Sequence, residues 1–439
     1  MLEPLYTADE MRAAEAGHDV EAMMERAGRG VAEAVLRRFP EARRVACVCG
    51  RGANGGDGRI AARVLREAGR DAVEELGEGA DVVVDALFGT GFRGEPRADA
   101  AELIRRMNGA GAPVVAVDVP SGVNASTGEV AGAAVRAAVT VTMHAPKVGL
   151  VVAPGRFHAG EVDVVEIGLE RAETEHRLVT GDVLARVPRR REGDNKYSAG
   201  AVLVVGGAPG LTGAACLAAE AAFRADAGYV AVAVPERSLP VVEQRLLEAV
   251  KRPIDEVDEL LPRMDALALG PGLGRGEEQR ALVRRLLSES SLPAVVDADG
   301  LHELQPFTRD APTVLTPHEG ELARLLGEES RWVATHRLEA IRRGVERFGC
   351  VVLLKGADTL VGAPGAGVLV RSANAPGLAT AGTGDVLTGI VAAFLAKGLE
   401  AQLAAAAGAV AQARAARLAP QQAGLVASDV VALLPRALA

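Results

Sequence analysis

Hydrophobic positions along the chain follow two alternating patterns. Short apolar runs, such as residues 45–49 and 201–205, have the length and composition of buried parallel strands. Longer segments, such as residues 20–39, repeat their apolar positions every three or four residues and therefore predict helices. An earlier helix is expected to begin at a capping box formed by Thr7 and Glu10. Because the two patterns alternate in both halves, we expect an α/β fold with parallel sheets covered by helices.

The first expected strand is followed by a glycine-rich segment, residues 50–58, and then by a helical pattern over residues 60–68. A strand, a glycine-rich turn and a helix form the arrangement of a nucleotide-binding crossover. Asn54 and Asp57 place oxygen atoms among the glycines, so this turn can hold a cation as well as a phosphate. A plain tight turn is the alternative.

Two later strands of the first half also end in a carboxylate and a glycine-containing loop, at Asp85 and at Asp118. A fourth apolar run, residues 140–147, ends at Lys147. The carboxyl ends of parallel strands meet at one sheet edge, where the ligand sites of α/β proteins lie. We therefore expect these side chains to converge on one site.

The stretch from Asn374 to Ile390 is the main candidate in the second half. Gly382 and Gly384 leave backbone N–H groups uncovered just before an apolar helical pattern, and the helix dipole favours an anion there. Asp385 would lie beside a phosphate bound in this loop, which makes it a candidate general base. A helix cap on an ordinary turn is the alternative.

Four other strands of the second half end in glycine or charged residues. These strand ends lie at residues 270–274, 297–300, 316–321 and 355–359. His318, Glu319 and Glu321 in the third of them are residue types that bind metals. Pro317 indicates a turn that leads into a helix, however, so we interpret the two acids, Glu319 and Glu321, as helix-capping residues.

Composition narrows the classes of function. A chain of 439 residues favours two domains, and the charged stretch from about Leu169 to Asp194 marks the expected boundary. The formal charge of −9 and the lack of a basic block argue against nucleic acid as a main partner. The sequence has no run of membrane length and no leader pattern. Cys47 and Cys49 share one strand in poor geometry for a disulfide, so we expect buried thiols and a cytoplasmic enzyme.

Four segments of the first half resemble, in order, the motifs of the NAD(P)H-hydrate epimerase domain (YjeF N-terminal type). They are residues 52–58, 85–91, 118–122 and 145–149. The resemblance implies that the substrate dinucleotide contacts Ala53, Asn54, Gly55, Gly56, Asp57, Gly89, Thr90, Gly91, Phe92, Arg93, Gly94, Glu95 and Asp118.

The same resemblance implies roles for particular side chains. Potassium would be bound by Asn54, Asp85 and Ser121, and Asp118 would be the acid/base with Lys147 as a helper. One position departs from the family pattern. Where the family usually has the first of two asparagines, this chain has Ala53, so one side-chain contact to the substrate is expected to be missing or moved.

The second half resembles the ribokinase-like NAD(P)H-hydrate dehydratase domain (YjeF C-terminal type). The matching motifs are Lys196-Tyr197 with Gly206-Gly207, residues 270–274, 297–300, 316–321, 355–359 and 382–385. The resemblance implies that the adenine nucleotide is bound by Lys355, Gly356, Ala357, Asp358, Thr359 and Gly384. It implies that the hydrated dinucleotide contacts Ala208, Gly272, His318 and Asp385, the last acting as the catalytic base.

Together the two resemblances predict a bifunctional enzyme that repairs hydrated NADH and NADPH. A Rossmann-like three-layer α/β/α domain (residues 1–170) would epimerise the hydrates, and after a linker (171–193) a ribokinase-like α/β domain (194–439) would dehydrate them with ADP and Mg²⁺. We expect small-molecule substrates and a homo-oligomer, with no nucleic-acid or membrane partner. The alternatives are a kinase for a small hydroxylated metabolite, and a first domain that only binds nucleotide or partners.

Overall fold

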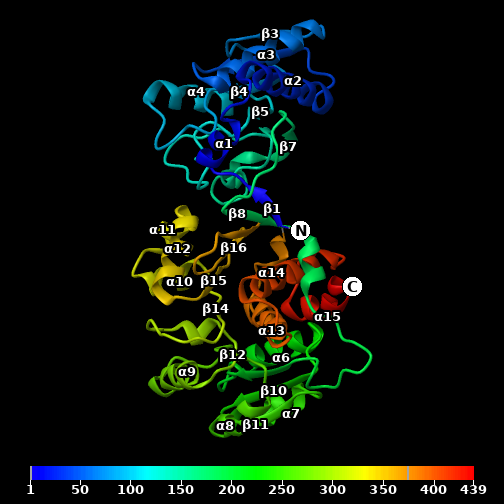
Figure 1. The fold of residues 1–439 in the computed structure, drawn as a ribbon, viewed down its shortest axis with the longest axis vertical. Helices are drawn as coiled ribbons and strands as arrows, with labels where there is room; N and C mark the ends of the chain where they lie inside the picture. Colours follow the sequence, from blue (N-terminus) through cyan, green and yellow to red (C-terminus); the bar gives the residue numbers. More distant parts are fainter. Residues whose placement is uncertain (1, 373–374) are drawn as a thin grey trace. The chain divides into compact units, whose positions relative to one another are not determined.

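The computed structural model describes residues 2–372 and 375–439 and divides into two compact units (Figure 1). One unit comprises Pro4–Arg177 with Ala334–Leu338, and the other comprises the remaining described residues. Each unit is built around its own sheet.

The first unit contains a six-stranded parallel sheet in the order β3-β2-β4-β5-β6-β7. Its strands are β2 (Arg44–Cys49), β3 (Asp71–Val73), β4 (Val82–Ala86), β5 (Val114–Val117), β6 (Val139–Met143) and β7 (Glu161–Val165). Its helices are α1 (Ala8–Glu15), α2 (Val20–Arg38), α3 (Ala53–Glu67), α4 (Ala98–Asn108), η1 (Val148–Leu150) and α5 (Arg156–Ala159). Since β2, β4, β5 and β6 are parallel neighbours, their carboxyl ends share one edge, as the strand pattern predicted.

Helix α3 begins earlier than the sequence pattern indicated. We expected a turn up to residue 58, but the helix starts at Ala53. The glycines serve close packing instead: a Cβ on Gly55 would lie 1.9 Å from the carbonyl oxygen of Gly50, and one on Gly58 would lie 2.4 Å from the Cβ of Ala86. The expectation of a turn was therefore wrong, because glycine is also needed where a helix lies directly against a strand.

The second unit is organised on an eleven-stranded mixed sheet in the order β1-β8-β17-β16-β15-β14-β13-β12-β9-β10-β11. The pairs from β15 through β14, β13, β12, β9 and β10 to β11 are parallel, whereas β15–β16 and β16–β17 are antiparallel. The strands are β1 (Leu2–Leu5), β8 (His176–Val179), β9 (Ala201–Val205), β10 (Tyr229–Val234), β11 (Val250–Pro253), β12 (Ala266–Leu269), β13 (Ala294–Val296), β14 (Thr313–Leu315), β15 (Val351–Leu354), β16 (Thr359–Gly362) and β17 (Leu369–Arg371).

The helices along this part of the chain carry much of its core. They are η2 (Gly181–Arg186), α6 (Thr212–Arg224), η3 (Glu236–Ser238), α7 (Leu239–Arg245), η4 (Ile254–Glu256), α8 (Val257–Leu260), η5 (Leu261–Arg263), α9 (Glu277–Glu289), η6 (Ala298–Leu301), α10 (Glu319–Leu326), α11 (Ser330–Thr335), α12 (Arg337–Phe348), η7 (Pro376–Leu378), α13 (Thr383–Ala396), α14 (Ala401–Leu418) and α15 (Ala427–Leu438). Helix α13 packs against α6 at Gly389, where a Cβ would lie 2.1 Å from the carbonyl oxygen of Ala218. Small residues therefore bring these helices close to one another and to the sheet.

In both units the core is built mainly from alanine, valine and leucine. All four cysteines (Cys47, Cys49, Cys216 and Cys350) are free thiols, as expected. Among the described residues, no helix combines the length and the apolar character needed to cross a membrane.

Candidate functional site

A cavity of about 1040 Å³ opens at the carboxyl edge of the six-stranded sheet. Of the residues that the sequence assigned to the substrate or to catalysis, the cavity is lined by Ala53, Asn54, Asp57, Gly89, Thr90, Gly91, Phe92, Arg93, Glu95, Asp118 and Lys147. Gly55, Gly56 and Gly94 do not line it. The strand ends therefore converge on one space, and most of the assigned residues face it.

Asp118 and Lys147 form an ion pair inside this cavity. Lys147 Nζ lies 2.7 Å from Asp118 Oδ1 and also donates to Thr142 Oγ1 (3.0 Å). The Lys147 side chain is fully buried, and Asp118 has the left-handed backbone conformation (φ 67°). That conformation costs a non-glycine residue about 1–2 kcal/mol, so the surrounding structure must hold it in place. The second carboxylate oxygen, Oδ2, accepts a bond from the Thr90 N–H (3.3 Å). The carboxylate is thus fixed at the cavity wall.

Two other carboxyl groups face the same cavity. Asp57 is only 8% exposed, and burial, with the charges of Asp118 and Glu15, raises its pKa to about 8. Burial and Asp118 also raise the pKa of Glu15. Glu15 was not identified from the sequence, because it lies on α1 outside every glycine motif. Its position in the cavity comes only from how α1 packs.

The three residues expected to bind potassium form a polar cluster beneath the cavity. Asp85 is fully buried, and it accepts hydrogen bonds from Ser121 Oγ (2.6 Å) and from the Ser121 N–H (2.8 Å). The Phe88 carbonyl accepts from Asn54 Nδ2 (2.9 Å), and the Phe88 N–H donates to Ser121 Oγ (2.9 Å). Burial raises the pKa of Asp85 to about 6, despite the bonds from Ser121 and Leu87 that lower it.

This cluster fits a monovalent cation in its donor chemistry. It offers a carboxylate, a hydroxyl and a backbone carbonyl, which are hard oxygen donors of the kind that hard cations prefer, whereas Asn54 turns its amide nitrogen toward that carbonyl. A cation would also offset the cost of burying the Asp85 charge. Among the described residues, no group of three or more His, Cys, Asp or Glu is arranged to hold a metal ion.

In the second unit, Asp385 lies in the first turn of α13. The helix is preceded by Gly382 in the left-handed conformation (φ 88°), which directs the chain into the helix. Burial raises the pKa of Asp385 to about 7, and the negative charge of Asp297 adds to the shift, while Lys355 opposes it. A carboxyl group that titrates near neutral pH can exchange protons with a substrate. The opening residue of the stretch predicted as a phosphate loop, Asn374, lies outside the described residues.

Asp297 and Lys355 form the charged centre next to α13. Lys355 Nζ lies 2.7 Å from Asp297 Oδ1, and Thr388 Oγ1 donates to Asp297 Oδ2 (2.8 Å). Burial disfavours the charge on Asp297, but the charge of Lys355 and the hydrogen bonds from Lys355, Thr388 and Thr316 together lower its pKa. Gly384 lies so close that a Cβ there would be 3.4 Å from both Asp297 Oδ2 and Lys355 Nζ. Asp297 belonged to a matched motif, but no role was assigned to it from the sequence.

His318 caps helix α10. Its Nδ1 accepts from the Gly320 N–H (3.0 Å) and the Glu321 N–H (3.4 Å), while Glu321 Oε2 accepts from the His318 N–H (2.9 Å). This is a capping box, so the capping interpretation is confirmed for Glu321, while His318 is itself the N-cap, a role that was not expected from the sequence. Glu321 Oε2 also lies 3.9 Å from Lys355 Nζ, which brings this cap to the charged centre.

The other assigned residues of the second unit lie in two places. Ala208 and Gly272 belong to adjoining loops after β9 and β12, where the Ala208 N–H donates to the Gly272 carbonyl (2.7 Å). Residues 355–358 form the turn between β15 and β16, and Thr359 begins β16. In this turn Gly356 and Ala357 are exposed, whereas Asp358 is buried.

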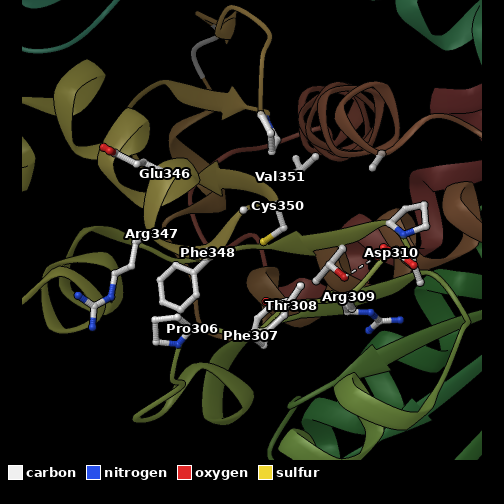
Figure 2. A pocket seen from close by; sticks show the side chains of 16 residues that line it. Pro306, Phe307, Thr308, Arg309, Asp310, Glu346, Arg347, Phe348, Cys350 and Val351 are labelled. Atoms are coloured by element: carbon white, nitrogen blue, oxygen red, sulfur yellow. Dashed lines mark hydrogen bonds between the residues drawn. The ribbon is translucent and has the colours of Figure 1, made fainter.

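Figure 2 shows a second cavity, of about 570 Å³, at the amino ends of β14 and β15. Phe307 and Phe348 lie in its wall, and Arg309 Nη2 donates to the carbonyls of Ser290 (3.0 Å) and Leu292 (2.5 Å). None of the assigned residues line it. It lies at the edge opposite to the strand ends that carry those residues, so we do not assign it to the activity.

Comparison with known proteins confirms the resemblance that the motifs indicated. Residues 202–436 match the family described as NAD(P)H-hydrate dehydratase, and residues 20–76 and 70–149 match the family of the YjeF-related protein N-terminus. The chain is similar to the bifunctional NAD(P)H-hydrate repair enzyme Nnr of Moorella thermoacetica, with 38% identity over 94% of this chain and 91% of that protein. The Nnr of Escherichia coli is 34% identical over 94% of this chain and 88% of that one.

Among solved structures, the second unit is similar to the ADP/ATP-dependent NAD(P)H-hydrate dehydratase from Bacillus subtilis, which was co-crystallised with ATP and Mg²⁺. The TM-score is 0.55 at 27% identity, over 59% of this chain and 96% of that one.

Proposed function

The chain belongs to the family of bifunctional NAD(P)H-hydrate repair enzymes, and we propose how its residues divide the two steps of that repair. It combines an epimerase domain with an ADP/ATP-dependent dehydratase domain. Its substrates are NADH or NADPH in which the nicotinamide ring has taken up water. The family assignment also sets aside the small-metabolite kinase that the ribokinase-like half alone would allow.

For epimerisation, Asp118 is the acid/base that acts at the hydrated carbon. The observation that carries this assignment is the ion pair of Asp118 with the fully buried Lys147 at the wall of the 1040 Å³ cavity. Lys147 fixes the carboxylate and places a positive charge beside it. The loops that begin at Ala53 and at Gly89 hold the dinucleotide, and the glycines let its phosphates approach the backbone.

Potassium is the proposed cation of the epimerase domain. Asp85, Ser121 and Asn54 would hold it, together with the backbone carbonyl of Phe88. When bound, the cation offsets the charge of Asp85 and orients the negatively charged dinucleotide. Asp85 is bonded to Ser121, and Asn54 and Ser121 are both bonded to the Phe88 backbone, so the cluster keeps its shape.

For dehydration, Asp385 is the general base. Hydroxide is a poor leaving group, so the substrate hydroxyl must first be converted into a better one. Asp385 takes the hydroxyl proton as the oxygen attacks the terminal phosphoryl group of a nucleotide, which leaves with one phosphate fewer. Phosphate then leaves the ring, and the neighbouring ring carbon loses a proton as the C=C bond forms. The N–H groups at the start of α13 would stabilise the negative charge of the transferred phosphoryl group.

The nucleotide site is assigned to the turn 355–359 and to Gly384. Lys355 is the cationic group of this site, and the absence of a side chain on Gly384 leaves room beside it. We propose ADP, with Mg²⁺, as the phosphoryl donor in preference to ATP. His318, Ala208 and Gly272 are assigned to the hydrated dinucleotide. Free cysteines fit a reducing cytoplasm, and the homo-oligomer stays a prediction.

The decisive experiment follows the near-ultraviolet absorbance of NADH in an epimer mixture of its hydrate. The full-length enzyme is supplied with ADP, with ATP or with neither. Full recovery of NADH with ADP supports both activities, because one epimer must first be converted into the other. Recovery that stops near half contradicts the epimerase assignment, and no recovery with either nucleotide contradicts the dehydratase assignment.

A further inference from the structure

We propose that Asp57 is the general acid of the epimerisation and acts together with Asp118, which lines the same cavity and is the general base. This inference rests on the proposed epimerase function and deepens it. The family resemblance assigned Asp57 only to substrate contact. The structure gives it the position and surroundings of a proton donor.

The first argument is the position of the side chain. Asp57 lies in the second turn of α3, is 8% exposed, and lines the same cavity as Asp118. Its Oδ1 atom is buried and has no hydrogen-bond partner among the described residues. A buried carboxyl oxygen without a partner is costly, unless a ligand completes it. A neutral carboxyl group costs less to bury in this state than a charged one, and Asp57 as a whole lines the cavity, where a substrate can take its proton.

The packing of the start of helix α3 holds Asp57 in this position. Helix α3 lies directly on the sheet edge, because Gly55 and Gly58 lack the Cβ atoms that would strike Gly50 and Ala86. One turn earlier, Asn54 is tied to the Phe88 carbonyl (2.9 Å). The start of the helix is therefore fixed against the loop after β4, and Asp57 cannot retreat to solvent.

The carboxyl groups of Asp57 and Asp118 differ in their charged neighbours. Asp118 has Lys147 at 2.7 Å, whereas the charged groups that act on Asp57 are the carboxylates of Asp118 and Glu15. The other charged residues that line the cavity are Arg51, Arg93, Glu95, Arg97 and Asp99. Burial first, and then the two carboxylates, raise the pKa of Asp57 to about 8, so it keeps its proton at neutral pH. Two carboxyl groups in different protonation states are what an acid–base pair requires.

With these two groups, epimerisation by loss and re-addition of water needs no further reactant. In the hydrated ring, the hydroxyl is on a carbon bonded to the ring nitrogen. Asp57 gives its proton to this hydroxyl, the carbon–oxygen bond breaks, and its electron pair leaves with water while the nitrogen lone pair forms a C=N bond. Water adds to the opposite face, and Asp118 takes its proton as the new carbon–oxygen bond forms. Each turnover moves one proton from Asp57 to Asp118. A turnover in the opposite direction, or proton exchange with solvent, restores the starting state.

The test measures interconversion of the separated epimers by chromatography, using the full chain without nucleotide so that dehydration does not interfere. Asp57→Asn keeps the size of the side chain but cannot supply the proton. We expect kcat to fall about 100-fold or more, the scale of general acid catalysis, with KM changed less than about threefold. Glu33→Gln, a similar neutralisation at an exposed position of α2, is the matched control and should leave kcat unchanged.

The pH profile of the wild-type enzyme gives a second test that needs no variant. An acid with a pKa near 8 must be protonated to act, so kcat should decline above about pH 8, and this decline should be absent in Asp57→Asn. Wild-type-like kcat in Asp57→Asn, a loss confined to KM, or a flat wild-type profile from pH 7 to 9 would overturn the inference. If the wild-type enzyme itself does not interconvert the epimers, the proposed epimerase function has failed, and the inference falls with it.

Discussion

Lys147 Nζ and Asp118 Oδ1 are 2.7 Å apart, and the lysine side chain of this pair is completely buried. A buried lysine is costly unless its charge is matched. Lys147 also donates to Thr142 Oγ1 and, at 2.6 Å, to the Met143 carbonyl, so its three donors are used. The pair therefore couples the stability of the epimerase domain to the placement of its proposed catalytic group.

Removing one partner of this pair should lower the stability of the first unit more than removing both partners does. Lys147→Met leaves Asp118 without its cation and should lower the unfolding free energy of the first unit by about 3–5 kcal/mol. Asp118→Asn should abolish most epimerisation, by about 100-fold or more. The double variant should regain part of the stability lost in Lys147→Met, but no activity. Thermal unfolding of the three variants measures this coupling, and additive losses of stability would contradict it.

The glycines of α3 give a prediction about stability alone. Gly55→Ala would place a Cβ 1.9 Å from the Gly50 carbonyl oxygen, so the helix must shift, at a cost of about 1–3 kcal/mol. Gly52→Ala is the matched control, because a Cβ there meets no atom within 4 Å. The melting temperatures of the two variants decide the question. Equal melting temperatures would mean that α3 does not lie this close to the sheet.

The same helix shows what the sequence could and could not predict. Strand β9 has the bounds that its apolar run predicted, Ala201–Val205, because a buried strand is encoded in its own residues. The start of α3 was misplaced, because the reason for its glycines is contact with Gly50 and Ala86, which local pattern does not reveal.

The functional residues show the same limit. Asp118 and Asp385 follow strand and loop patterns, so the sequence identified them as candidates. Glu15 reaches the cavity only through the packing of α1, and no motif includes it. Asp297 was matched within a motif, yet its pairing with Lys355, 58 residues further on, is a tertiary contact. Residues that act through such tertiary contacts can be identified only from the structure.

The cation cluster leads to a prediction that separates the two activities. Asp85→Asn removes the carboxylate from the proposed potassium ligands, so epimerisation should fall and lose its dependence on potassium. Dehydration of the reactive epimer should be unaffected, since it belongs to the other unit. The measurement compares both rates in potassium and sodium chloride at equal ionic strength. Wild-type epimerisation that is equal in the two salts and in a tetramethylammonium salt would refute a role for an alkali cation.

The last prediction concerns Asp385. A general base must be ionised to accept a proton, and burial raises the pKa of this carboxyl to about 7. The dehydration rate should therefore rise about tenfold per pH unit below pH 7 and level off above it, whereas the acid Asp57 predicts the opposite trend for epimerisation. Asp385→Asn should remove dehydration, by about 100-fold or more, and leave epimerisation intact. Asp255→Asn, a change at an exposed carboxylate of the same unit, is the control. If Asp385→Asn also stopped epimerisation, the two activities would not be separate, and a dehydration rate independent of pH between 5 and 8 would rule out Asp385 as the base.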